Sequence, residues 1–209
     1  MPHLVLLGDS VFDNSAYVPF GRDVLSQLTN TLPPSWSVDL FAEDGATTND
    51  VERQVRAIPQ KASHLLLSIG GNDALLRADL LVTPVMSTAE AFELLHEAVA
   101  QFTADYQRAL HRCLGLGIPT IVCTIYGGSF EDQRSSQAIA AALAVFNDAI
   151  VRTAIESSVP VLDLRFICKA PGDFTNSIEP SAIGSIKIAQ AISRAVAEGL
   201  GQTGTRFFI

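Results

Sequence analysis

Short apolar runs alternate with helical segments along almost the whole chain, and this alternation limits the folds that it can adopt. The apolar runs end at turn-forming residues, as strands buried on both faces do. They span residues 3–8, 36–42, 64–69, 118–125 and 160–164. Helix-like segments lie at about residues 19–31, 47–57, 89–114, 134–157 and 181–198. This order predicts an α/β fold, in which a five-stranded parallel sheet forms the middle layer of a three-layer α/β/α sandwich.

The chain has 209 residues, of which 48% are hydrophobic, and this is enough for one domain with a substantial core. We expect a single domain over residues 1–200 and a C-terminal tail over residues 201–209, loose at Gly201 to Gly204. No apolar run approaches about 20 residues, so no membrane-spanning helix is expected. The start of the chain lacks the basic lead-in and the apolar length of a signal peptide. A cytoplasmic location is therefore expected.

The net charge, the cysteines and the spacing of possible metal ligands limit which partners and cofactors are expected. A formal net charge of −8 argues against a nucleic-acid backbone or an anionic membrane as the main partner. The three cysteines lack Cys-x-x-Cys spacing and are expected to be reduced thiols. No His, Cys or Glu grouping has the spacing of metal ligands. We therefore expect a small-molecule ligand, no metal and no cofactor, and we leave the oligomeric state open.

Short polar turns follow three of the predicted strands. Gly8, Asp9 and Ser10 follow the first strand, Gly45 follows the second and Asn72 the third. In a parallel sheet the carboxyl ends of the strands meet at one edge, where ligands bind. We therefore expect these residues to lie together. A serine on a tight turn after a strand is well placed to be a nucleophile, although it could also cap a helix.

The same residues could stabilise the oxyanion of an acyl-transfer reaction, which needs hydrogen-bond donors aimed at the developing charge. The backbone N–H groups of Ser10 and Gly45 can supply two donors, and the side-chain amide of Asn72 can supply a third. Asp9 is expected to accept N–H groups of its own turn and so to fix the serine. Gly45 could instead be an ordinary turn glycine, and Asn72 could bond its own loop.

Together with a later segment, these motifs resemble the SGNH, or GDSL, hydrolase superfamily of lipase- and esterase-like enzymes. The motifs are Gly8-Asp9-Ser10, Gly45, Gly71-Asn72 and Asn176-Ser177-Ile178-Glu179-Pro180-Ser181. The resemblance implies a flavodoxin-like fold and gives the oxyanion-hole roles to Ser10, Gly45 and Asn72. Members of the superfamily carry Asp-x-x-His before the last helix, and that histidine is the base for the serine. In this chain Asn176 and Glu179 stand at the two positions.

Glu179 is the most economical base for Ser10, because a carboxylate can take the serine proton if burial raises its pKa. Asn176 could support it through an amide hydrogen bond. Alternatively, Glu179 completes the start of the last helix with Pro180 as the first helical residue, and a helix N-terminus would lower its pKa. The other candidate proton acceptors are His96, Asp13 and Asp173.

These features predict a GDSL-type carboxylic ester hydrolase that forms an acyl-enzyme on Ser10. The expected substrate is a small ester or an acetylated compound. The missing histidine leaves open a binding or regulatory module with weak or no turnover. An alcohol acceptor in place of water would instead make the protein an acyltransferase. Residues 74–88, rich in leucine and valine, could line an acyl pocket, form a lid, pack in the core or form a dimer contact.

Overall fold

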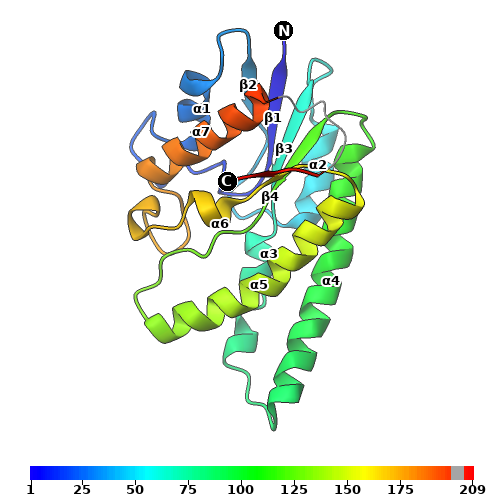
Figure 1. Ribbon diagram of the computed structural model, residues 1–209, viewed down its shortest axis with the longest axis vertical. Coiled ribbons are helices and arrows are strands. Elements are labelled where there is room, and N and C mark those ends of the chain that lie inside the picture. Colours follow the sequence, from blue (N-terminus) through cyan, green and yellow to red (C-terminus); the bar gives the residue numbers. More distant parts are fainter. Residues whose placement is uncertain (199–204) are drawn as a thin grey trace.

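The computed structural model describes residues 1–198 and 205–209, which form a six-stranded sheet between two layers of helices (Figure 1). The strand order is β2-β1-β3-β4-β5-β6, and all neighbouring strands are parallel. The strands are β1 (His3–Gly8), β2 (Ser37–Leu40), β3 (His64–Ser68), β4 (Thr120–Cys123), β5 (Val161–Leu162) and β6 (Phe207–Phe208). The predicted sandwich is confirmed, and the two-residue edge strand β6 makes six strands where five were expected. The tail residues Gly201 to Gly204, expected to be loose, lie outside the described residues.

Each segment expected to be helical contains a helix, and the short helices outside those segments were not predicted. The helices are α1 (Val24–Thr31), α2 (Val51–Arg56), α3 (Gly71–Leu75), α4 (Thr88–Leu114), α5 (Gln133–Glu156), α6 (Leu164–Ile167) and α7 (Ala182–Ala197), with the 3₁₀ helices η1 (Thr48–Asp50), η2 (Ala78–Leu81) and η3 (Pro171–Asp173). Helices of five residues or fewer are too short to show an apolar period. The expected start of the first helix at residue 19 is wrong. The helix begins at Val24, where the Asp23 side chain accepts a hydrogen bond from the backbone N–H of Ser26 at 2.9 Å.

The two helical layers cover opposite faces of the sheet. Leu4 and Leu6 of β1 pack in the core cluster that contains α1 and α7, whereas Val5 and Leu7 pack in the cluster that contains α2, α4 and α5. All four side chains are fully buried. Figure 1 shows α1 and α7 together on one side of the sheet and α4 and α5 together on the other. Burial on both faces explains why the strands lack the polar alternation of a half-exposed sheet.

Helix α5 is unusually apolar. Within the described residues it is the one helix that is long and apolar enough to cross a membrane, with a mean hydropathy of 1.6 over an 18-residue window. The expectation that no helix spans a membrane stays a prediction. About 33% of the window is buried, and Phe146 and Ile150 of this helix pack in the core cluster shared with α4.

The ends of β1 and β3 lie very close together at the edge of the sheet that carries the candidate site. Gly8 has a φ of +121°, and a Cβ added there would lie 1.7 Å from the carbonyl oxygen of Ser68, so this position requires glycine. The N–H of Asp9 donates to the same Ser68 oxygen at 3.0 Å. The turn after β1 and the loop after β3 therefore begin next to each other. The N-terminal part of α4 projects beyond this edge, at the bottom of Figure 1.

Candidate active site

Ser10 lies on a turn that follows β1, and no helix begins there. The N–H groups of Phe12 and Asp13 donate to the carbonyl of Asp9 at 3.1 and 3.2 Å. The side chain of Asp9 accepts a hydrogen bond from the N–H of Val11 at 3.1 Å, so it holds the turn as the sequence predicts. Because no helix follows, the Ser10 hydroxyl is not used as a helix cap.

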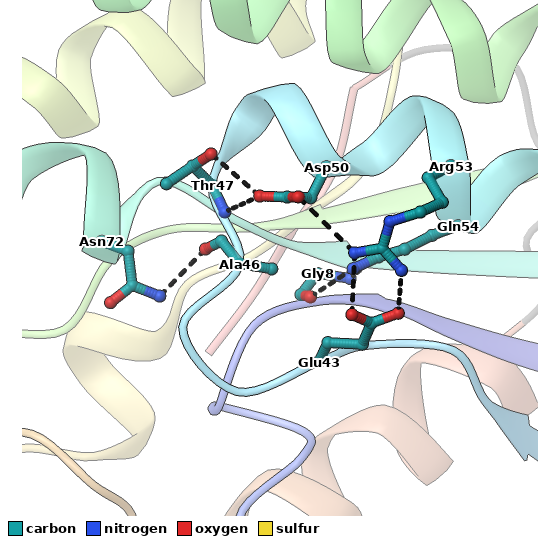
Figure 2. A network of polar contacts seen from close by, with 8 residues as sticks. All are labelled: Gly8, Glu43, Ala46, Thr47, Asp50, Arg53, Gln54 and Asn72. Carbon is teal, nitrogen blue, oxygen red and sulfur yellow. Dashed lines mark hydrogen bonds and ion pairs between the residues drawn. The ribbon is translucent and has the colours of Figure 1, made fainter.

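Gln54 of α2 fixes the residue from which this turn starts (Figure 2). Its Oε1 accepts from the N–H of Gly8 at 2.7 Å, and its Nε2 donates to the Gly8 carbonyl at 2.8 Å. Strand β2 has already ended at Leu40, and the N–H of Glu43 still donates to the Gly8 carbonyl at 3.0 Å. Gln54 therefore takes the place of a strand partner for the Gly8 N–H. Sequence reasoning missed this residue. The available signal was a polar side chain three residues after Val51, on the buried face of its helix.

The hydroxyl of Ser10 donates a hydrogen bond to Glu179 Oε1 at 3.1 Å. Both residues are buried, with exposed fractions of 9% for Ser10 and 4% for Glu179. The backbone of Glu179 is held by Thr175, whose N–H donates to its carbonyl at 2.9 Å. Its own N–H donates to Asn176 Oδ1 at 2.8 Å. Asn176 therefore supports Glu179 through the main chain, and no hydrogen bond joins the two side chains among the described residues.

The last helix begins two residues later than expected. Ser181 is the N-cap of α7, and its Oγ accepts from the N–H groups of Ile183 and Gly184 at 3.1 and 3.2 Å. The expectation that Pro180 is the first helical residue is therefore wrong. Ser181 performs the capping role considered for Glu179, which leaves the Glu179 carboxylate free to contact Ser10.

Burial raises the pKa of Glu179 above its ordinary value of 4.5. The hydrogen bond from Ser10 opposes this shift, and the negative charge of Asp44 adds to it. The second carboxylate oxygen, Oε2, is buried and has no hydrogen-bond partner in the part of the chain that is described. A buried carboxylate with so few donors binds a proton more readily than an exposed one. The site can therefore accept the serine proton.

Three hydrogen-bond donors follow the ends of β1, β2 and β3, and two of them, on Ser10 and Asn72, belong to residues that line one cavity. The backbone N–H groups of Ser10 and Gly45 donate to no acceptor within residues 1–198 and 205–209. Asn72 lies in the first turn of α3, and its Nδ2 donates to the carbonyl of Ala46 at 2.9 Å (Figure 2). This bond uses one of the two amide hydrogens and leaves the other free. It also ties α3 to the loop that carries Gly45.

That loop, residues 43–47, is held at both ends (Figure 2). At one end the guanidinium of Arg53 forms an ion pair with the carboxylate of Glu43. At the other end Asp50 accepts hydrogen bonds from the N–H and the hydroxyl of Thr47, at 2.8 and 3.0 Å. Helix α2 and the 3₁₀ helix η1 before it therefore fix loop 43–47, and α2 also fixes the end of β1 through Gln54.

The other candidate proton acceptors are engaged elsewhere. Asp13 accepts the backbone N–H of Asp44 at 3.0 Å, which joins the serine turn to loop 43–47. Asp173 forms an ion pair with Lys187 at 2.6 Å. His96 lines a separate groove between α4 and α5 and is not among the residues that line the cavity beside the serine.

A cavity of about 520 Å³ opens beside Ser10 and extends between α4 and α5. Its polar wall includes Asp9, Asn72 and Glu179, and most of the remaining wall is apolar. The large apolar side chains that line it include Leu75, Leu80, Leu81, Phe92, Leu95, Tyr126, Phe130, Ile139, Leu143, Val145 and Phe146. Of the roles considered for residues 74–88, the structure therefore shows the lining of a pocket. An apolar cavity with a few convergent polar groups is typical of a small-molecule site.

Comparison with known proteins identifies similar sequences and folds. The GDSL-like Lipase/Acylhydrolase family model matches residues 6–184. An extracellular lipase from Streptomyces rimosus has a TM-score of 0.69 and 18% identity, covering 93% of this chain and 99% of that chain. A phospholipase A1 from Streptomyces albidoflavus NA297 has a TM-score of 0.72 and 19% identity, covering 93% and 98%. The esterase EstA from Pseudoalteromonas sp., inhibited by monoethylphosphonate, has a TM-score of 0.68 and 14% identity, covering 97% and 100%. No curated protein sequence matches. At these identities the likenesses to solved structures show the shared fold.

Proposed function

Because the chain belongs to the GDSL-like lipase/acylhydrolase family, we propose that it is a carboxylic ester hydrolase with Ser10 as nucleophile and Glu179 as base. The observation that carries this proposal is the buried hydrogen bond of 3.1 Å from Ser10 Oγ to Glu179 Oε1. A nucleophile and a base within hydrogen-bond reach are the minimum that covalent catalysis requires.

The reaction proceeds in two halves. Ser10 Oγ attacks the ester carbonyl carbon while its proton moves to Glu179, and the N–H groups of Ser10 and Gly45 and the amide of Asn72 donate to the oxyanion. The intermediate collapses by breaking the bond to the alcohol oxygen, which takes the proton from Glu179. Water then attacks the acyl-enzyme and gives a proton to Glu179. That proton returns to Ser10 Oγ as the carboxylic acid leaves.

A glutamate is ordinarily a weaker base than a histidine, and the surroundings of Glu179 reduce this difference. Burial raises its pKa, so the proton transfer from Ser10 is less unfavourable than transfer to an exposed glutamate. Oε1 carries the hydrogen bond to Ser10, while Oε2 has no partner among the described residues. Protonated Glu179 can therefore donate to the leaving alcohol from Oε1, the oxygen that contacts Ser10.

The cavity supports an apolar acyl group of several carbons as the natural substrate. Its walls between α4 and α5 are formed mainly by leucine, isoleucine, valine, alanine and phenylalanine side chains. An acetyl group would leave most of this surface uncovered, whereas each buried methylene contributes about 0.8 kcal/mol. We therefore propose that the substrate class, expected from the sequence to be a small or acetylated ester, includes esters with a longer acyl chain. The proposed reaction needs no cofactor or metal.

Labelling with a fluorophosphonate tests the nucleophile. We expect one phosphonyl group on the native protein, located by mass spectrometry on the peptide that contains Ser10, and none on Ser10→Ala. Ser15→Ala removes an exposed serine five residues away and provides the matched control, which should label like the native protein. Equal labelling of Ser10→Ala would contradict the proposal.

A further inference from the structure

Asp9 is a second buried carboxyl group in the wall of the cavity, beside Ser10 and Glu179. It is 3% exposed, and its Oδ1 accepts one hydrogen bond, from the N–H of Val11 at 3.1 Å. No cation forms an ion pair with Asp9 in the described chain. A buried carboxylate costs free energy unless cations or several donors compensate it. The surroundings of Asp9 therefore favour the protonated acid.

Two other aspartates of this fold expose as little surface as Asp9 but have a cation. Asp163 is 2% exposed and pairs with Arg165 at 2.5 Å. Asp173 is 1% exposed and pairs with Lys187 at 2.6 Å. In both cases the hydrogen bonds and the cation outweigh the effect of burial, and the pKa lies below its ordinary value. Asp9 therefore differs from both in two ways, because it has no cation and because it lies deeper inside the protein.

The ionisable groups that face Asp9 come from four elements and add no positive charge. They are Glu179 before α7, Asp73 in α3, Cys123 in β4 and Tyr126 after β4. Burial raises the pKa of Cys123 and Tyr126, so both stay neutral. Burial first, with the negative charges of Glu179 and Asp73 in addition, raises the pKa of Asp9 to about 7.

We propose that Asp9 is a positioning residue that supports acyl transfer in its neutral form, and that its ionisation switches the site off. This proposal rests on the proposed function, in which an oxyanion forms beside Ser10. Asp9 directly precedes Ser10, and its Oδ2 lies 3.7 Å from where a Cβ on Gly71 would be. Gly71 is the neighbour of the oxyanion donor Asn72. A negative charge here repels the oxyanion, and the mostly apolar cavity wall screens that repulsion weakly.

Neutral Asp9 also leaves Glu179 as the single anion next to the serine. Two carboxylates that interact in one buried site lose their protons in coupled steps, and the second loss is the harder one. The active form of the pair therefore carries one proton, with Asp9 as the protonated member. Asparagine mimics this form, because its carbonyl can accept the N–H of Val11 and its NH₂ group replaces the acid O–H.

The pH dependence of kcat/KM on a short-chain nitrophenyl ester tests the proposal, with the full chain, Asp9→Asn and Asp163→Asn measured in parallel. For the native protein we expect kcat/KM to fall above about pH 7 by about tenfold per pH unit. Asp9→Asn should lose this alkaline fall. Asp163→Asn, which removes an aspartate that is 2% exposed and follows β5, should keep it. A native profile that stays flat to about pH 9, or an alkaline fall that persists in Asp9→Asn, would overturn the proposal.

Carbon-13 NMR of the aspartate carboxyl carbons in the native protein gives a second result that needs neither turnover nor a stable variant. One aspartate that titrates at about 7 supports the proposal, and titration of every aspartate in the ordinary acidic range overturns it. Fluorophosphonate labelling across the same pH range distinguishes a failure of the proposed function from a failure of the role proposed for Asp9. No labelling at any pH contradicts the proposed function, whereas labelling without an alkaline fall contradicts the role of Asp9 alone.

Discussion

Gln54 and Gly8 exchange two hydrogen bonds across 46 residues of sequence, at 2.7 and 2.8 Å. The pair joins helix α2 to the last residue of β1, where the turn that carries Ser10 begins. The same helix holds loop 43–47 through Arg53 and Glu43. One short helix therefore positions both the candidate nucleophile and a candidate oxyanion donor.

Replacement of Gln54 by leucine should weaken the fold and the site together. The Gly8 N–H would lose its acceptor in a buried position, which costs about 1 to 3 kcal/mol. We expect urea denaturation to show a loss of this size and kcat/KM to fall by about tenfold or more, because the Ser10 turn is less well held. Gln101→Leu, at an exposed position of α4, should change neither quantity. Native-like stability of Gln54→Leu would contradict this account of the pair.

The apolar cavity should give the protein a preference for longer acyl chains. On nitrophenyl esters we expect kcat/KM to rise by about fourfold per added methylene until the chain fills the cavity. Ala142→Phe places a large side chain in the cavity wall and should remove this preference while sparing the acetate ester. Ala140→Phe lies on the same helix, does not line the cavity, and should keep it. A native preference for acetate would contradict the proposed acyl site.

The raised pKa of Asp9 should also appear in the stability of the fold. Between its ordinary pKa of 3.8 and about 7 the unfolded chain releases a proton that the folded chain keeps, so stability falls as pH rises. The loss is about 1.4 kcal/mol per pH unit, or up to roughly 4 kcal/mol, and it is complete above about pH 7. Denaturant unfolding at several pH values should show this slope in the native protein relative to Asp9→Asn. Parallel pH dependence of the two proteins would contradict it.

The sequence sufficed for the fold and for the expectation that Ser10, Asn72 and Glu179 lie near one another, since all three line one cavity. Strands β1, β3, β4 and β5 are buried on both faces, so their apolar runs are nearly continuous and easily recognised. Ser10, Gly45 and Asn72 each follow a parallel strand, and topology alone brings such positions to the same edge. The contact between Ser10 and Glu179, 169 residues apart, could be anticipated in the same way because Glu179 precedes the last helix.

Other features depend on packing that the sequence does not display. The two hydrogen bonds between Gln54 and Gly8 form only if α2 packs with Gln54 directly beside the end of β1. The two residues of β6 are too few to show any period, and they pair with β5 only because the chain returns to the sheet edge. The neutral state favoured for Asp9 depends on the absence of a nearby cation. Asp163 has such a cation in Arg165, and this difference is visible only in the folded structure.

The pairing of Ser10 with Glu179 is tested most directly by the pH dependence of ester hydrolysis in Glu179→Gln. Glutamine keeps the size of the side chain and an oxygen that can accept the Ser10 hydrogen bond, but it cannot take the proton. We expect kcat/KM to fall by about 10² to 10⁴-fold and the acidic limb of the native pH profile to disappear, while the melting temperature stays close to that of the native protein. Activity within a few-fold of native, with the same acidic limb, would contradict the assignment of Glu179 as the base.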